Sequence, residues 1–358
     1  MRTYVAIVYN QPQTSRYDGA HEEKAVLGVL EAVAAVREAL LELEYGVSLL
    51  PLTPPWPEAR EELEALNADI VFNLFEGFCG EPETEALVPQ TLAELKIPLT
   101  GCPAPALRLA LDKARVKVIL QAAGIPTPDF QLLNPRTLHL FRLGFPCIVK
   151  PRGEDASHGI TAASVVRDAA SLEKQVTAMS RTYGGALVEA FVGGREFNAT
   201  VMGNSRYSLL PPSEINYSLP PEVPPILTFE AKWDTDSAYF RGTRVTCPAE
   251  ITPGELKKIR RTALAAFRLT GCRGYARVDM RQDGEGVLHV LEVNPNPDIS
   301  PGTGAARQAL ASGMTYAGFI KRIVILALEK EKHDRHHPAH VRGGQTGRNA
   351  DTAQYARI

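Results

Sequence analysis

The chain has 358 residues, of which 44% are hydrophobic, and a net charge of −2 at pH 7. Its length and composition suffice for about two or three domains with a sizeable core, so folding needs no disulfide frame. The near-zero charge and the lack of a Lys/Arg stripe argue against nucleic acid as the main partner. No apolar run approaches the roughly 20 residues that span a bilayer.

The cysteines are odd in number and widely spaced, at positions 79, 102, 147, 247 and 272. Most have apolar neighbours, which favours reduced core thiols over a disulfide frame or a zinc site. The chain starts with a strand pattern and not with a signal peptide. We therefore expect a cytoplasmic enzyme without a membrane segment.

The first hundred residues alternate strand and helix patterns. Residues 3–10 predict a buried strand and residues 20–46 a helix. The apolar stripe of this helix comprises Val26, Leu30, Val33, Leu40 and Leu41. A strand at 47–53, a short acidic helix and a strand at 69–75 repeat the cycle, which predicts a parallel sheet. Ligands of such sheets lie beyond the carboxyl ends of the strands, where Glu76 occurs.

A second unit begins after a Pro- and Gly-rich link, with a helix predicted over 105–123. The segment FPCIVKPRGEDASHGI then combines an apolar strand, Lys150 at its end and a loop with two glycines. Lys150 could neutralise a phosphate, and Gly153 and Gly159 would let backbone amides approach it. The Walker motif is absent, and for Lys150 alone the alternative is an ordinary surface lysine.

Two carboxylates flank a Gly-Gly turn in the segment LVEAFVGGREF. Glu189 and Glu196 could bind the base and the ribose hydroxyls of a nucleotide. For either carboxylate alone, a salt bridge is the alternative.

The segment from Gly274 to Asp298 is the most informative part of the sequence. Arg277 and Asp279 share one face of a predicted strand, and Glu292 and Asn294 share one face of the next strand. Pairing of the two strands would gather these four polar groups on one surface. Two carboxylates and an amide oxygen beside an arginine suit Mg²⁺ bound to a nucleoside triphosphate. The alternative is a hairpin with a solvated polar face.

Seven segments in this order resemble the ATP-grasp superfamily, and within it the D-alanine–D-alanine ligase family. They are ALRLALDKARVKVILQAAGIPTPDF, PCIVKPRGEDASHGI, LVEAFVGGREF, LPPSEINY, FEAKW, CPAEI and RVDM…LEVNPNPD. The resemblance implies an α/β ATP-grasp fold of three domains. These are a substrate-binding domain with a parallel sheet at 1–102, a lid domain at 103–186 and a metal-binding catalytic domain at 187–332, followed by a mobile polar tail at 333–358.

The resemblance also implies an ATP-dependent ligase that joins a carboxylate to an amine through an acyl-phosphate. The residues that bind ATP would be Lys113, Lys150, Glu189, Glu196 and Lys232. Two Mg²⁺ ions, with Mn²⁺ as the alternative, would be held by Asp279, Glu292 and Asn294. Catalysis would depend on Lys232, on Ser157 in the lid and on Arg277, which would stabilise the acyl-phosphate and the tetrahedral intermediate. Homodimers are common in the family, although the sequence does not determine the oligomeric state of this chain.

The chain departs from the family pattern around the substrates. Glu76 replaces a His, Ala156 a Ser, Trp233 a Tyr and Asp298 a Gly, and the Gly-Gly-x-Ser-x-Glu segment after the first strand is altered. These changes predict that D-alanine is a poor substrate, or at least not the preferred one at both positions, among small amino-acid or carboxylate substrates. The predicted substrate contacts are Glu76, Asp298, Ser300 and Thr303.

Two alternatives to a D-alanine–D-alanine-type ligase remain at this point. One is a ligase for other amino acids, or for a small carboxylate and an amine. The other is a nucleotide-binding regulatory protein without turnover, against which the retained Arg277, Asp279, Glu292 and Asn294 argue. Four histidines in the polar tail could hold a metal, although a solvated tail is the alternative.

Overall fold

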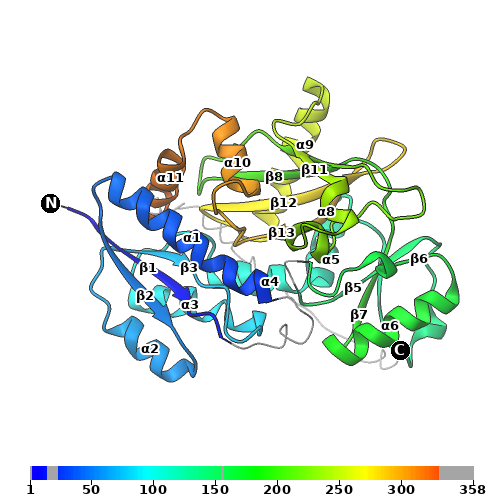
Figure 1. Ribbon diagram of the computed structural model, residues 1–358, viewed down its shortest axis with the longest axis horizontal. Helices are drawn as coiled ribbons and strands as arrows, with labels where there is room; N and C mark the ends of the chain where they lie inside the picture. Colours follow the sequence, from blue (N-terminus) through cyan, green and yellow to red (C-terminus); the bar gives the residue numbers. More distant parts are fainter. Residues whose placement is uncertain (1, 14–22, 155–156, 330–358) are drawn as a thin grey trace, which may run out of the picture. The chain divides into compact units, whose positions relative to one another are not determined.

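A three-stranded parallel sheet begins the chain (Figure 1). The structure is a computed structural model that describes residues 2–13, 23–154 and 157–329. The strands, in the order β2-β1-β3, are β1 (Tyr4–Asn10), β2 (Gly46–Leu52) and β3 (Ile70–Leu74). The accompanying helices are α1 (Glu23–Glu42), α2 (Trp56–Glu64), η2 (Pro82–Thr84) and α3 (Leu87–Leu95). The predicted alternation and the parallel sheet are confirmed.

Helix α1 buries only part of the stripe that the sequence predicted, namely Val33 and Leu40. Its buried side chains include Val29, Val33, Val36 and Leu40, which have the spacing of one helix face. Leu30 and Leu41, assigned to the stripe, are 38% and 42% exposed. Each follows a buried residue directly, so apolar character alone did not reveal the buried face. The side chain of Val26 lies outside the described residues.

The helix predicted over 105–123 is two helices in the structure, α4 (Ala104–Leu111) and α5 (Lys113–Ala122). They meet at Asp112, whose carboxylate accepts a hydrogen bond from the backbone N–H of Arg115 at 3.2 Å. An aspartate that caps a new helix interrupts the chain without a proline or a glycine. The apolar periodicity therefore did not show the break.

The middle of the chain forms a four-stranded antiparallel sheet, in the order β4-β7-β5-β6, with helix α6 (Ala169–Tyr183) packed against it. Its strands are β4 (Phe130–Leu133), β5 (Cys147–Pro151), β6 (Val165–Val166) and β7 (Ala186–Ala190), with short helices η3 (Leu138–Leu140) and η4 (Ala162–Ser164) between them. Because β7 pairs with β4 and β5, the sheet extends past residue 186. The division into three domains stays a prediction.

A six-stranded antiparallel sheet carries most of the predicted site. Five of its strands run in the order β11-β10-β8-β12-β13, and β9 pairs with β8. They are β8 (Glu196–Met202), β9 (Ser208–Leu209), β10 (Ser213–Tyr217), β11 (Thr243–Thr246), β12 (Tyr275–Gln282) and β13 (Leu288–Asn294). The helices of this region are α7 (Phe229–Trp233), α8 (Ala238–Gly242), α9 (Pro253–Leu269), α10 (Gly304–Ala311) and α11 (Tyr316–Leu328).

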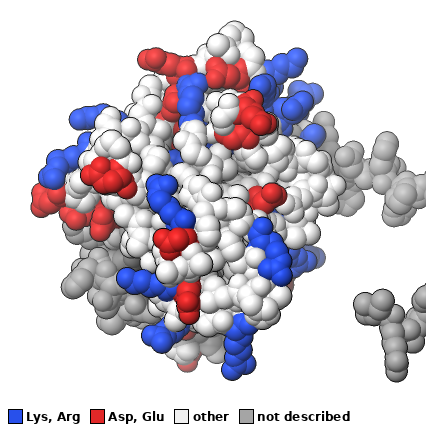
Figure 2. All heavy atoms as spheres, turned by 90° about the vertical axis from the view of Figure 1, so that its right-hand side faces the viewer, with Lys and Arg blue, Asp and Glu red and all other residues white. Residues whose placement is uncertain are grey.

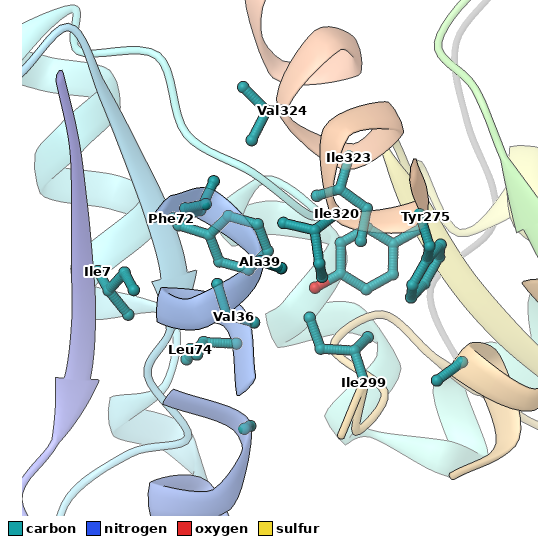
Figure 3. Close-up of a cluster of buried hydrophobic side chains, with 14 of the residues drawn as sticks. Ile7, Val36, Ala39, Phe72, Leu74, Tyr275, Ile299, Ile320, Ile323 and Val324 are labelled. Carbon is teal, nitrogen blue, oxygen red and sulfur yellow. The ribbon is translucent and has the colours of Figure 1, made fainter. Parts of the chain in front are cut away.

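Residues from both ends of the described chain share one apolar core (Figure 3). Ile7 and Phe72 of the parallel sheet pack in the same cluster as Ile320 and Val324 of α11. The last described helix therefore helps to bury the first sheet, and residues up to Leu328 form one compact unit. The tail predicted at 333–358 lies outside the described residues.

Charged side chains of both signs are interspersed on the face shown in Figure 2. On that face, the described residues therefore form no field of one sign that would attract a polyanion. Within the described ranges, no single helix is long and apolar enough to cross a membrane, and α10 and α11 meet those limits only as a pair bent by 105°.

Candidate functional site

The β12–β13 hairpin brings four predicted site residues together. Its antiparallel register places Arg277 opposite Asn294 and Asp279 opposite Glu292. Residues opposite each other and residues two apart on a strand share a face, so all four side chains project from one surface of the sheet. This is the arrangement that the strand pattern predicted. The role of these residues in binding metal stays a prediction.

Arg277 and Asp279 form a two-fold charged contact on β12. The Arg277 Nε and Nη2 atoms each lie 2.8 Å from one oxygen of the Asp279 carboxylate. Asn198 on β8 donates a third hydrogen bond to that carboxylate at 2.7 Å. Burial would lower the pKa of Arg277, but Asp279 and Glu292 raise it above its usual value, so the guanidinium stays charged.

Glu292 is the more open of the two hairpin carboxylates, with 36% of its side chain exposed. Burial opposes its ionisation, yet Lys113, Arg277 and other cations of the site lower the pKa of Glu292 to about 2. The nearest of these, the Lys113 ammonium, lies 3.9 Å from the carboxylate. On the same strand, Asn294 accepts a hydrogen bond from the Asn296 N–H at 3.1 Å through its amide oxygen.

A cavity of about 880 Å³, open to solvent, lies over this hairpin. Its lining includes all the residues predicted to bind ATP together with the lid serine and most of the hairpin group, namely Lys113, Lys150, Glu189, Glu196, Lys232, Ser157, Arg277, Asp279 and Glu292. An adjoining cavity of about 430 Å³ shares Lys113 and Glu292 with it and adds Asn294. The predicted nucleotide and metal groups thus line two cavities that share Lys113 and Glu292, with several cations available to phosphates.

Both carboxylates predicted to face the nucleotide have charged partners in the protein. Glu189 lies between Lys150 and Lys117, at 2.9 Å and 3.1 Å. Glu196 lies 3.1 Å from Arg281 and accepts a hydrogen bond from the hydroxyl of Tyr217 at 2.8 Å. Burial raises the pKa of Glu196 above its usual value despite Arg281. Salt bridges, the alternative named from the sequence, are therefore present, and contact with adenine and ribose stays a prediction.

The lid loop lies against helix α7. Ser157 has φ 66°, in the left-handed region, and His158, only 4% exposed, stacks on the Phe229 ring with 5.6 Å between ring centroids. Behind the loop, the Lys113 ammonium donates to the carbonyl oxygen of Glu154. These contacts keep the described part of the loop at the cavity that its residues line.

Comparisons with known proteins agree with this geometry. Residues 119–325 match the family model described as the D-ala D-ala ligase C-terminus. A D-alanine–D-alanine ligase of Alcanivorax borkumensis is 32% identical over 312 residues, which cover 87% of this chain and 92% of that protein. The chain belongs to the D-alanine–D-alanine ligase family. An uncharacterized protein of Sinorhizobium fredii, y4sG, is 35% identical over 303 residues, covering 82% of this chain and 85% of that protein.

Solved structures of the family share the fold. A D-alanine–D-alanine ligase from Bacillus anthracis matches with a TM-score of 0.72 at 21% identity, covering 91% of this chain and 97% of that one. The VanG D-Ala:D-Ser ligase from Enterococcus faecalis also matches with a TM-score of 0.72, at 18% identity, covering 92% of this chain and 100% of that one. The predicted ATP-grasp fold is confirmed.

Two of the four residues that depart from the family pattern, Glu76 and Asp298, lie in loops. Glu76 is exposed after the end of β3, and its N–H donates to the side-chain oxygen of Asn10 at 3.0 Å. Asp298 is also exposed, and its carboxylate accepts the N–H of Ser300 at 2.8 Å. Neither carboxylate lines the two cavities described above. Their contact with substrate stays a prediction.

The two hydroxyls predicted to meet the second substrate differ in their surroundings. Thr303 donates within its own loop, to the carbonyl oxygens of Ser300 at 2.7 Å and Asp298 at 3.0 Å, and Ser300 is buried. A single hydroxyl proton cannot serve these carbonyls and a substrate together. Donation of a hydrogen bond by Thr303 to a substrate would therefore require a change in the loop. Ala156, another departure from the family pattern, lies outside the described residues.

Three polar residues of the site escaped the sequence-based prediction. Lys117 follows Lys113 by one helical turn, and Arg281 follows Asp279 on the same face of β12, so both had a positional signal. Asn296 donates its side-chain N–H to the carboxylate of Glu85 at 2.7 Å and to the Phe75 carbonyl at 3.3 Å. No sequence pattern links residues so far apart.

The hairpin residues fit a magnesium ion that accompanies a nucleotide. Within the described ranges, no group of three or more His, Cys, Asp or Glu forms a metal cage. The donors are instead two carboxylates and an amide oxygen, on Asp279, Glu292 and Asn294. Mg²⁺ usually takes one or two carboxylates and completes its shell with water and phosphate oxygens. This set therefore fits Mg²⁺ that is partly held by ATP.

Proposed function

We propose that this protein is an ATP-dependent carboxylate–amine ligase of the D-alanine–D-alanine ligase type, acting on small amino-acid or carboxylate substrates. The observation that carries the proposal is the hairpin, whose arginine and two carboxylates line a cavity together with three lysines, while its amide lines the adjoining cavity. Phosphoryl transfer requires alignment and charge neutralisation more than covalent chemistry by the protein. The residues present supply both.

Each group has a proposed task in this reaction. Lys113, Lys150 and Lys232 bind the phosphates of ATP and offset their charge. Bound magnesium, held by the hairpin carboxylates and Asn294, would neutralise charge on the transferring phosphoryl group. Arg277, fixed by its two bonds to Asp279, faces the oxygens that gain charge when the amine attacks the acyl-phosphate. The lid loop with Ser157 keeps water from the acyl-phosphate.

We further propose that D-alanine is not the preferred substrate at both positions. A carboxylate at Glu76 or Asp298 cannot donate a hydrogen bond to the carboxylate of an amino acid and would repel it. It would instead favour an amine or a polar side chain. The proposal is supported by the exposure of both carboxylates and, for Glu76, by its place beyond the end of β3 in the parallel sheet, where ligands of such sheets bind.

The deciding experiment measures phosphate release from ATP with Mg²⁺ across a panel of D- and L-amino acids and small amines, with the amide product identified by mass. Amide formation that depends on both substrates supports the ligase. ATP binding without phosphate release under any combination would favour the nucleotide-binding regulatory alternative. Dominant formation of D-alanyl-D-alanine would refute the proposed change of substrate while keeping the ligase.

Magnesium as the resident ion, a homodimer and a cytoplasmic location are further parts of the proposal. Replacing Mg²⁺ by Mn²⁺ should keep activity, whereas Ca²⁺, with its longer bonds and higher coordination number, should support it poorly. Sedimentation of the purified chain would test the dimer.

A further inference from the structure

One buried cation at the nucleotide site has no part in the proposed mechanism. Lys117 on α5 is 1% exposed, and its ammonium lies 2.8 Å from the hydroxyl oxygen of Thr127 and 3.1 Å from Glu189. The Thr127 hydroxyl donates its own proton to the Val290 carbonyl at 2.7 Å, so its oxygen is left to accept from Lys117. This chain of contacts fixes the ammonium behind the cavity.

Glu189 divides its two oxygens between two lysines. Oε1 faces Lys117, whereas Oε2 accepts a hydrogen bond from Lys150 at 2.9 Å. The side chain of Lys150 is 18% exposed and lines the cavity, whereas those of Glu189 and Lys117 are each 1% exposed. One carboxylate cannot neutralise two ammonium groups, so the trio carries a net positive charge. The exposed member, Lys150, presents that charge to the cavity.

The ionisation of the trio agrees with this arrangement. Burial opposes the charge on Glu189, but Lys117 and Lys150 together hold the pKa of its carboxyl below the usual value. Burial likewise opposes the charge on Lys150, but Glu189 raises its pKa. Burial lowers the pKa of Lys117 despite Glu189. Lys117 is thus the member of the trio whose charged form is most costly to bury, and the attraction of Glu189 must offset this cost.

We infer that Lys117 is a positioning residue for ATP: by holding one oxygen of Glu189 it leaves the charge of Lys150 available to the nucleotide phosphates. The inference rests on the proposed function. Without Lys117, the carboxylate would have Lys150 as its nearest cation, and the two charges would cancel. The phosphates would then lose an attraction that the base and the ribose do not share.

The test compares ATP with adenosine in calorimetric titrations of the full chain. Lys117→Met keeps most of the length of the side chain without its charge, and should weaken ATP binding by at least ~10-fold while changing adenosine binding less than about twofold. Lys257→Met, which removes an exposed lysine from α9, is the matched control and should bind both like the wild type. Equal loss of ATP and adenosine affinity would show a merely structural role and overturn the inference.

A second variant separates positioning from folding. Glu189→Gln removes the carboxylate that would capture Lys150, so Lys117→Met should weaken ATP binding less in a Glu189→Gln background than in the wild-type background. This comparison cancels any loss that Glu189→Gln causes by itself, and an equal loss in both backgrounds would overturn the inference. Wild-type protein that binds no ATP would overturn the proposed function as well. Wild-type binding and turnover with an unaffected Lys117→Met variant would overturn this inference alone.

Discussion

Replacing Glu292 by Gln should change the pH dependence of folding stability in a defined direction. The folded protein lowers the pKa of Glu292 from 4.5 to about 2, so its ionised form stabilises the fold above pH 4.5 and this contribution disappears as the pH falls to about 2. The shift corresponds to at most about 3 kcal/mol. Because 36% of the side chain is exposed, solvent screening reduces this to on the order of 1 kcal/mol.

Urea unfolding of the ligand-free protein at several pH values measures this term. At pH 7, Glu292→Gln should unfold about 1 kcal/mol more easily than wild type, and the gap should close as the pH falls from about 4.5 towards 2. Glu285→Gln, at the exposed turn of the same hairpin, is the control and should show no such gap. A constant difference at all pH values would mean that the cations of the site do not act on Glu292 as described.

The same variant tests the metal site, because Gln keeps the shape of the side chain and loses its charge. Turnover should fall by at least ~10²-fold, and the stabilisation that Mg²⁺ with ATP gives the wild type should shrink. Near-normal phosphate release by Glu292→Gln would refute the assignment of this carboxylate to the metal.

Three other substitutions follow from the contacts of the site. Arg277→Met leaves the buried Asp279 without its charged partner and should lower the free energy of unfolding in urea by roughly 3–5 kcal/mol. Adding Asp279→Asn should restore part of that stability. An unchanged urea midpoint for Arg277→Met would contradict the buried ion pair. Asn296→Ala removes the side-chain donor to the Glu85 carboxylate and the Phe75 carbonyl and should cost about 1–3 kcal/mol in urea unfolding; an unchanged midpoint would contradict a role for these two bonds in holding the loop. Glu76→His should raise kcat/KM for D-alanine by about tenfold, and no gain would remove Glu76 from the substrate site.

The grouping of polar residues on the hairpin could be predicted from the sequence because it depends on residues that are close together along the chain. Arg277 and Asp279, or Glu292 and Asn294, are two residues apart, and a short turn between the strands leaves few registers. The lysines of the cavity needed the family resemblance, since nothing in an isolated strand such as CIVKP distinguishes a phosphate ligand from a surface lysine. The resemblance identified these segments by their order, and the fold shows that their lysines line the same cavity.

The partners of the site residues could not be predicted, for a physical reason. Each pairing joins elements that meet only through tertiary packing: Lys117 of α5 meets Glu189 of β7, and Asn296 meets Glu85. The break of the predicted helix at Asp112 has the same origin in part, because that carboxylate also binds Arg152 at 2.6 Å, forty residues along the chain. Such contacts leave no periodic pattern.

These partners explain how so many charges can share one site before ligands arrive. In the ligand-free protein the carboxylates of Glu189, Glu196 and Asp279 are matched with lysines or arginines at 2.8–3.1 Å, whereas the nearest cation to Glu292 is 3.9 Å away. Glu292 is therefore the carboxylate that can accept a metal with the least rearrangement of its neighbours. Magnesium that binds together with ATP would pair with the Glu292 carboxylate, and the phosphates of ATP would pair with the lysines. Each charge of the site would then have an opposite charge beside it, so binding of the metal and binding of the nucleotide should depend on each other.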